Sequence, residues 1–340
     1  MLYRGFVTLS LCSLLACLHK SPETATPDTA TVKNLNQTAT VISLNQMSAE
    51  ELQALSDRNQ EIYCQKFTTF DLCSSETKEI LRIPGISVLY LLQSPSVEDL
   101  EILNQFSFLV LDIDAISLKQ AQVLSQFKGR WLYLDGLRSL DVESAQALSQ
   151  FKGSELYLNG LTSLDAESAK ALSQFQGSLY LNGLTSLDAE TAQALSLFQG
   201  WDLYLNGLTS LDAETAKALS QFKGGELYLN GLTSLDAETA QALSRFQRML
   251  ILDGLTSLDA ETAQALSQFK GNELSLPGLR SLDVESAKAL SQFQGGKLYL
   301  NGLQNLAPEV RFELEKNSNI MLDSNIRMPH PDFSGFDMED

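Results

Sequence analysis

The stretch LYLNGLTSLDAETAQALS, residues 179–196, recurs with few changes from about residue 127 to residue 303. The interval between copies is 23 or 24 residues. A fixed period of this length indicates a solenoid, in which each unit buries its apolar face only against neighbouring units. A phenylalanine closes each copy, and these residues are Phe127, Phe151, Phe175, Phe198, Phe222, Phe246, Phe269 and Phe293.

The first half of each repeat has the pattern of a short strand. In Glu155-Leu156-Tyr157-Leu158-Asn159 the apolar residues alternate with polar or amphipathic ones, as expected for a strand with one buried face. Gly160 follows and permits a sharp turn.

The second half of each repeat has the pattern of a helix. Asp165 is a good N-cap residue, and Glu167 places a negative charge in the first turn, where it suits the helix dipole. Gly177 is the candidate C-cap. One apolar stripe at a spacing of three residues consists of Ala169, Leu172 and Phe175.

Stacking these units predicts an α/β solenoid with one parallel sheet and a row of helices. Strands in a sheet lie about 4.8 Å apart, which is closer than helices can pack. The sheet is therefore expected on the concave side and the helices on the convex side.

The repeated core Leu-x-Leu-x-Gly-Leu-x-x-Leu, followed by a helix, resembles a bacterial leucine-rich repeat of the short helical kind and covers more than half the chain. The resemblance implies a leucine-rich repeat solenoid. The usual repeat has Asn or Cys where Leu161, Leu184 and Leu208 stand here. In place of the family's asparagine ladder, we expect Thr162 and Ser163 to bond the turn backbone.

Alternation along the strands places three columns of side chains on the concave face. The central column is Tyr133, Tyr157, Tyr180, Tyr204, Tyr228 and Tyr299, interrupted by Ile251 and Ser275. On one side lie Asp135, Asn159, Asn182, Asn206, Asn230, Asp253 and Asn301, and on the other Trp131, Glu155, Asp202, Glu226, Met249, Glu273 and Lys297. Tyrosine suits recognition, but stacked tyrosines also stabilise a sheet, so a structural ladder alone and a ladder that also binds both stay open.

The candidate ligand-binding residues are Trp131, Tyr133, Tyr157, Asn159, Tyr180, Asn182, Tyr204, Asn206, Tyr228 and Asn230. The columns change character at Trp131, Trp201, Met249, Ile251, Ser275 and Pro277, and these positions are expected to contribute most to specificity.

Composition argues against several classes of function. The net charge of −18 disfavours nucleic acid, which requires a basic face. The two histidines, His19 and His330, lie outside the repeats, so a histidine triad or zinc site is not expected there. The Asp and Glu at each helix start fit capping better than calcium binding, because capping oxygens are committed to backbone amides. We expect no enzyme activity, no cofactor and no metal.

The N-terminus has the pattern of an export signal. Arg4 precedes an apolar run, and residues 1–17 end in Leu14-Leu15-Ala16-Cys17, which resembles a bacterial lipobox with Cys17 as the lipidated residue. A plain cleaved signal and an uncleaved anchor are the alternatives. Residues 18–46 are rich in Thr, Ala, Pro, Ser and Asn, which is typical of a flexible tether.

Residues 47–82 are predicted to form an N-terminal cap. In an exported protein, Cys64 and Cys73 indicate a disulfide, with two free buried thiols as the alternative. Residues 83–327 form the solenoid with its C-terminal cap, and its outer coils use Ile86, Val88 and Leu89, then Leu109 to Leu111, and last Ile320 to Leu322 as strand positions. Residues 328–340 form an acidic tail.

These features predict a non-catalytic protein–protein interaction module, lipid-anchored in a bacterial envelope. It would act as a monomer, meet the membrane only through its anchor, and bind a protein through its concave face. The alternative is a structural or glycan-contacting envelope protein, in which Tyr rings stack on sugars.

Overall fold

A computed structural model describes residues 66–67, 88–91, 103–104 and 106–322. One sheet of 12 strands follows chain order from β1 to β12, and each pair of neighbouring strands is parallel. The strands are β1 (Lys66–Phe67), β2 (Val88–Leu91), β3 (Phe108–Leu111), β4 (Trp131–Tyr133), β5 (Glu155–Tyr157), β6 (Ser178–Tyr180), β7 (Leu203–Tyr204), β8 (Glu226–Tyr228), β9 (Met249–Ile251), β10 (Glu273–Ser275), β11 (Lys297–Tyr299) and β12 (Ile320–Met321).

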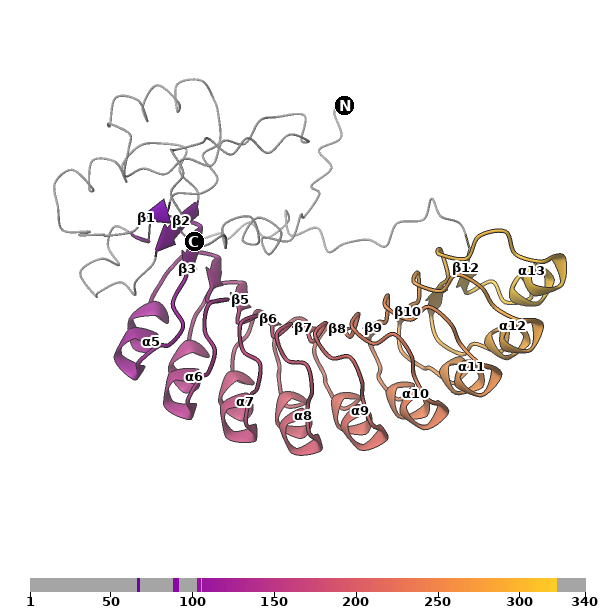
Figure 1. The fold of residues 1–340 in the computed structure, drawn as a ribbon, viewed down its shortest axis with the longest axis horizontal. Coiled ribbons are helices and arrows are strands. Elements are labelled where there is room, and N and C mark those ends of the chain that lie inside the picture. The colour runs from indigo at the N-terminus through magenta and orange to yellow at the C-terminus, as the bar shows by residue number, and fades with distance from the viewer. Residues whose placement is uncertain (1–65, 68–87, 92–102, 105, 323–340) are drawn as a thin grey trace, which may run out of the picture.

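From β3 to β11, each strand is followed by one short helix. The helices are α5 (Leu118–Leu124), α6 (Val142–Leu148), α7 (Ala166–Leu172), α8 (Ala189–Leu195), α9 (Ala213–Leu219), α10 (Ala237–Leu243), α11 (Ala260–Ser267), α12 (Val284–Leu290) and α13 (Pro308–Leu314). The coils form an arc, with the strands along its inner side and the helices along its outer side (Figure 1). The predicted fold class, a leucine-rich repeat solenoid with a concave sheet, is confirmed.

An N-cap aspartate immediately precedes each helix from α6 to α12. Asp165 has extended backbone angles, and its Oδ1 accepts a hydrogen bond from the Ser168 backbone N–H at 2.8 Å. This bond holds the pKa of the Asp165 carboxyl below its usual range. Asp165 is thus the N-cap that the sequence predicts, with Glu167 in the first turn.

The prediction for the helix end was wrong. Helix α7 stops at Leu172 with Ser173 as its C-cap, so Gly177 is not the C-cap. A Cβ atom at Gly177 would collide with the Ser154 carbonyl oxygen of the neighbouring coil. Gly177 therefore permits close approach between coils rather than a helix cap.

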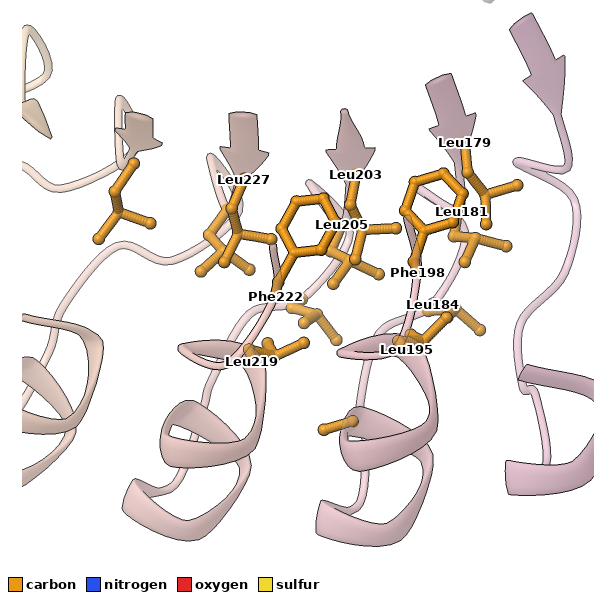
Figure 2. Packing of buried hydrophobic residues seen from close by; sticks show 14 of the residues in the cluster. Leu179, Leu181, Leu184, Leu195, Phe198, Leu203, Leu205, Leu219, Phe222 and Leu227 are labelled. Atoms are coloured by element: carbon orange, nitrogen blue, oxygen red, sulfur yellow. The ribbon is translucent and has the colours of Figure 1, made fainter. Parts of the chain in front are cut away.

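The core fills the space between sheet and helices with leucine and phenylalanine. Leu179, Leu181 and Leu184 enter it from the strand side, and Leu195 and Phe198 from the end of α8 (Figure 2). The phenylalanine rings of successive coils stack, with centroids 5.8 Å apart for Phe198 and Phe222. Successive coils have the same apolar side chains at the same positions, so the packing between one pair of coils recurs between the next pair.

Hydroxyl groups add hydrogen bonds between coils, though not those expected. The Oγ atom of Ser168 donates to the Leu140 carbonyl oxygen at 3.2 Å, and Thr239 Oγ1 donates to Leu211 at 3.2 Å. These hydroxyls sit in the first helical turn, whereas Thr162 and Ser163 in the turn before the helix are exposed. In these two coils, the hydroxyl that bonds the preceding coil therefore belongs to the residue three positions after the N-cap.

Several predicted features lie outside the described residues: the signal with Cys17, the tether over 18–46, the pair Cys64 and Cys73, and the tail over 328–340. Within the predicted cap, β1 pairs in parallel with β2, so the sheet continues into that region. Strands β2, β3 and β12 contain the outer-coil strand positions that are described, except Leu322, which follows β12.

Candidate binding face

The concave face carries three columns of side chains whose register comes from the parallel sheet. Tyr133, Tyr157, Tyr180, Tyr204 and Tyr228 are successive partners across β4 to β8, and Ile251, Ser275 and Tyr299 continue the row. We call this row the tyrosine column. The leading column precedes it by two residues on each strand and the asparagine column follows it by two. The structure thus aligns the candidate residues as the alternation predicted.

The five consecutive tyrosines of the tyrosine column form one continuous stack. Ring centroids lie 3.9 Å apart for Tyr133 and Tyr157, and 4.0 Å apart for each of the next three pairs. The ring planes differ by 9° to 16°. Each inner ring therefore has a neighbour on both faces and presents only its edge and hydroxyl toward the concave side.

Carboxylates of the leading column hold two of these hydroxyls. The Tyr157 hydroxyl donates to Glu155 Oε2, and the Tyr228 hydroxyl donates to Glu226 Oε2. Glu155 is only 8% exposed, and burial raises the pKa of its carboxyl. The sequence signal was a Glu two positions before a Tyr on the same strand, which places both on one face.

Burial also raises the pKa of the tyrosines. Desolvation is the largest cause at Tyr204, whose pKa rises to about 12 even though hydrogen bonds with Tyr228 and Tyr180 lower it. Burial is also the largest cause of the raised pKa of the Tyr157 hydroxyl, and nearby charges raise this pKa further. The tyrosine column is therefore protonated throughout the physiological range.

Alternation along the strand predicts that Asp202 points outward, whereas the structure buries its side chain. Asp202 is 6% exposed, and its carboxylate accepts hydrogen bonds from the Ser178 hydroxyl at 3.0 Å and the Glu226 backbone N–H at 3.0 Å. Burial raises the pKa of this carboxyl. Asp202 thus joins three adjacent strands and does not present a free charge to a ligand.

The asparagine column is a ladder of hydrogen bonds between coils. Asn159 Oδ1 accepts from the Asn182 backbone N–H at 3.0 Å, and Asn182 Oδ1 accepts from Asn206 at 2.9 Å. The same bond recurs from Asp135 at one end to Asp253 at the other. The expectation that an asparagine ladder would be replaced was therefore wrong. The ladder exists, but its asparagine stands two positions earlier in the repeat than the Asn or Cys of the usual leucine-rich repeat.

This ladder gives a structural role to four candidate binding residues. Asn182, Asn206 and Asn230 are half-buried, and each has its side-chain oxygen engaged by the next coil. Asn159 has the same arrangement. Their side-chain oxygens thus have a structural role, and their role as ligand contacts stays a prediction.

The columns change where the sequence predicted, but two of the changes are buried. Ile251 is 1% exposed and Ser275 is 0% exposed, so neither can contact a ligand in this conformation. Pro277 has no backbone N–H to continue the ladder, and Asp253 Oδ1 instead accepts from the Ser275 hydroxyl at 2.8 Å. This coil thus has Ser275 and Pro277 where most other coils have Tyr and Asn, and the Ser275 hydroxyl replaces the missing backbone donor to Asp253.

Both tryptophans lie near the start of a strand: Trp131 is the first residue of β4, and Trp201 lies two residues before β7. Trp131 is half-buried, with its ring centroid 4.3 Å from that of Phe108 and 6.4 Å from that of Tyr133. Trp201 is 42% exposed. Trp201 is therefore the most accessible aromatic residue predicted for specificity.

No group of three or more His, Cys, Asp or Glu side chains within the described coils could hold a metal ion. In the same part of the chain, no helix combines the length and apolar character that a membrane span requires.

Comparison with known proteins gives likeness of shape only. A scan against protein-family models and a search of curated proteins found no match. Among solved structures, the chain is similar to one from the Toll–Spatzle complex, described as a molecular hub in Drosophila development and innate immunity. That match has 12% identity and a TM-score of 0.49, and covers 84% of this chain and 43% of the other.

A second similar structure is the TLR13–ssRNA13 complex, with 18% identity and a TM-score of 0.48, covering 77% of this chain and 39% of the other. This chain therefore spans less than half the length of the solved chains that it matches.

Proposed function

We propose that this protein is a non-catalytic binding module that engages a protein partner through the concave face. The observation that carries the proposal is the row of tyrosine edges and hydroxyls from Tyr157 to Tyr228, which is half-buried rather than sealed. Large aromatic side chains that are already held rigid offer contact area at little entropic cost.

The chemistry of the face favours a partner that donates hydrogen bonds. The Tyr157 and Tyr228 hydroxyls donate hydrogen bonds to Glu155 and Glu226, so the hydroxyl oxygens remain able to accept. The carboxylates beside them add negative potential. Lys or Arg side chains and free backbone N–H groups on a protein surface would satisfy both features.

The glycan alternative receives less support from this geometry. Stacking on a sugar requires an open ring face, and the faces of Tyr157, Tyr180 and Tyr204 are covered by neighbouring rings at 4.0 Å. Among the tyrosine-column residues, only edges are offered. A glycan would have to use Trp201, which lies at the border of the face.

We also propose the lipid anchor at Cys17 and a bacterial envelope location, on the basis of the signal sequence and lipobox. Incorporation of labelled palmitate that is lost in Cys17→Ala would support the anchor, and unlabelled wild-type protein would refute it.

The binding proposal is tested by a pull-down from envelope extract with the full chain and two variants. In the concave variant, Tyr180, Tyr204 and Tyr228 are changed to Phe, which keeps the stack and removes three hydroxyls. In the matched control, three exposed residues of the convex helices, Gln193, Lys217 and Gln241, are changed to Ala.

We expect a partner that binds the wild type and the convex control, and binds the concave variant at least about tenfold more weakly, which corresponds to about 1.4 kcal/mol. Equal binding by the wild type and the concave variant, or selective loss in the convex control, would contradict the proposal. Absence of any partner would favour the structural interpretation of the tyrosine column.

A further inference from the structure

The two lateral flanks of the solenoid differ in charge. Because all strands are parallel and each is followed by a returning helix, every helix starts on one flank and ends on the opposite one. We call these the helix-start flank and the helix-end flank. Both lie at right angles to the concave face, so a contact on them would leave that face open.

The helix-start flank is acidic from α6 to α12. Each helix contributes an N-cap Asp and a Glu two residues later, and all are exposed: Asp141, Glu143, Asp165, Glu167, Asp188, Glu190, Asp212, Glu214, Asp236, Glu238, Asp259, Glu261, Asp283 and Glu285. Two cations, Arg138 and Arg280, lie in the turns that precede α6 and α12.

The helix-end flank carries charge of the opposite sign. Between α5 and β11, the segments that join each helix to the next strand expose Lys128, Arg130, Lys152, Lys223, Arg245, Arg248 and Lys270. The same described segments expose no carboxylate, since Glu155 and Asp202 are buried and Glu226 and Glu273 are half-buried on the concave face. Cations therefore gather on one flank of a chain whose net charge is −18.

The helix dipole explains part of this pattern. Negative charge near a helix N-terminus and positive charge near its C-terminus each stabilise the helix. The dipole does not explain the apolar residues on the same two flanks. Leu118, Val142 and Val284 are 42%, 38% and 45% exposed at the first position of α5, α6 and α12.

The helix-end flank has its own exposed apolar pair. Leu197 is 51% exposed and Trp201 is 42% exposed, in the segment between α8 and β7. Other coils have polar residues or glycine in these places, such as Gln174 and Gly177. Of the large apolar side chains exposed in the described part of the chain, only Phe312 lies away from the two flanks.

We infer that copies of this protein associate side by side, with the helix-end flank of one copy against the helix-start flank of the next. The occupant is a second copy because the cations of the helix-end flank, in the segments that follow α5, α6, α9, α10 and α11, are spaced by the same coil period as the acidic pairs of the helix-start flank. Leu197 and Trp201 add exposed apolar area to the helix-end flank after α8, and Leu118, Val142 and Val284 add it near both ends of the helix-start flank. This proposal differs from the expectation of a monomer, which stays the alternative, and it is independent of the concave-face proposal.

The contact is heterologous, since two different flanks meet. A heterologous contact leaves one unused flank at each end of an assembly, so rows can grow beyond a dimer. The overall negative charge opposes this growth through long-range repulsion, which salt screens. Association at moderate ionic strength therefore requires the local pairing of flanks.

Sedimentation velocity of the full chain tests the inference. All samples carry Cys17→Ser, which removes the predicted lipid site. At about 0.1 M ionic strength, where the screening length is about 10 Å, we expect the sedimentation coefficient to rise with protein concentration. At about 1 M, where this length is about 3 Å, we expect the dissociation constant to rise at least about tenfold.

Charge-swap variants identify the surfaces. One variant changes Lys152, Lys223 and Lys270 to Glu, and the other changes Glu190, Glu214 and Glu238 to Lys, which leaves every N-cap Asp in place. We expect each variant alone to stay monomeric and an equimolar mixture to associate again, because the two reversed flanks complement each other.

The matched control changes Lys170, Lys217 and Lys288 to Glu, which alters net charge as the first variant does but on the exposed side of α7, α9 and α12. We expect this control to associate like the wild type. A monomeric wild type at 0.1 M would overturn the inference, as would equal loss of association in the control or no recovery in the mixture.

Discussion

At the scale of single residues, the concave face pairs tyrosine with buried carboxylates. Glu155 has little contact with water and binds the Tyr157 hydroxyl. An ionised carboxylate in such a place loses hydration that one hydrogen bond only partly replaces, which is why burial raises the pKa of Glu155. The side chain therefore orients Tyr157 at a cost that depends on pH.

The dependence on pH has a definite sign. Below the ordinary Glu pKa, near 4.5, Glu155 is protonated in both folded and unfolded chains and has no effect. As pH rises above that value the unfolded chain ionises first, so the folded state loses stability until the raised pKa is passed. The exposed N-cap aspartates, such as Asp188, act oppositely: their pKa is lowered, and their contribution is lost as pH falls below about 3.8.

We predict that Glu155→Gln makes the protein more resistant to urea at neutral pH. Gln keeps an acceptor for the Tyr157 hydroxyl and cannot ionise. Urea midpoints of wild type and variant should coincide near pH 4 and separate toward pH 7, with the variant higher. Glu167→Gln, at an exposed position in α7, is the control. A variant that is less stable at pH 7 would show that the ionised carboxylate is a net stabiliser.

At the scale of elements, the turn that ends each strand is fixed by its neighbour in the next coil. The Asn206 side chain accepts from the Asn230 backbone, and Gly207 follows because a Cβ atom there would collide with the Asn182 carbonyl oxygen. Asparagine and glycine are thus required together: one supplies the hydrogen bond between coils, and the other permits the close approach.

We predict that Asn206→Ala destabilises the protein by about 1 kcal/mol, because the half-buried Asn230 N–H loses its acceptor. Asn206→Asp should retain most of the stability, since Asp135 performs the same role for Asn159 in the native chain. Thr209→Ala, in the exposed part of the turn, should change the unfolding free energy by less than about 0.5 kcal/mol. Urea denaturation measures all three, and equal stability of Asn206→Ala and Thr209→Ala would contradict the ladder.

At the scale of the whole molecule, stability is a sum over contacts between neighbouring coils. Leu227 pairs with Leu203 on one side and with Leu250 on the other, and the stacked Phe222 and Phe246 repeat this relation in the core. Removing one complete coil would bring two similar surfaces together.

Deletion of residues 222–245 is therefore expected to leave a folded protein. It places β7 beside β9, so Tyr204 meets Ile251 as Tyr228 does in the native chain. At about 0.05 to 0.15 kcal/mol per residue, loss of the coil should lower the unfolding free energy by about 1 to 4 kcal/mol. Deletion of residues 222–233 breaks the register and should abolish cooperative unfolding. Complete unfolding of the full-coil deletion would contradict independent coils.

The fold class, the coil period and the N-caps could all be predicted from the amino-acid sequence. These follow from interactions within one repeat: alternation for the strand, Asp165 before an apolar stripe for the helix, and a period that only stacking satisfies. The sequence also placed Tyr157 and its equivalents in one column, because parallel register follows from near-identical copies.

The role of each column, in contrast, depends on contacts between coils. Whether Asn182 faces a ligand or bonds the next coil depends on the distance between coils, which no single repeat encodes. Likewise, Asp202 and Ser275 are polar residues at nominally outward positions, and only the packing of adjacent strands shows that they are buried. The separation of charge between the two flanks also appears only once parallel strands place every helix start on the same side.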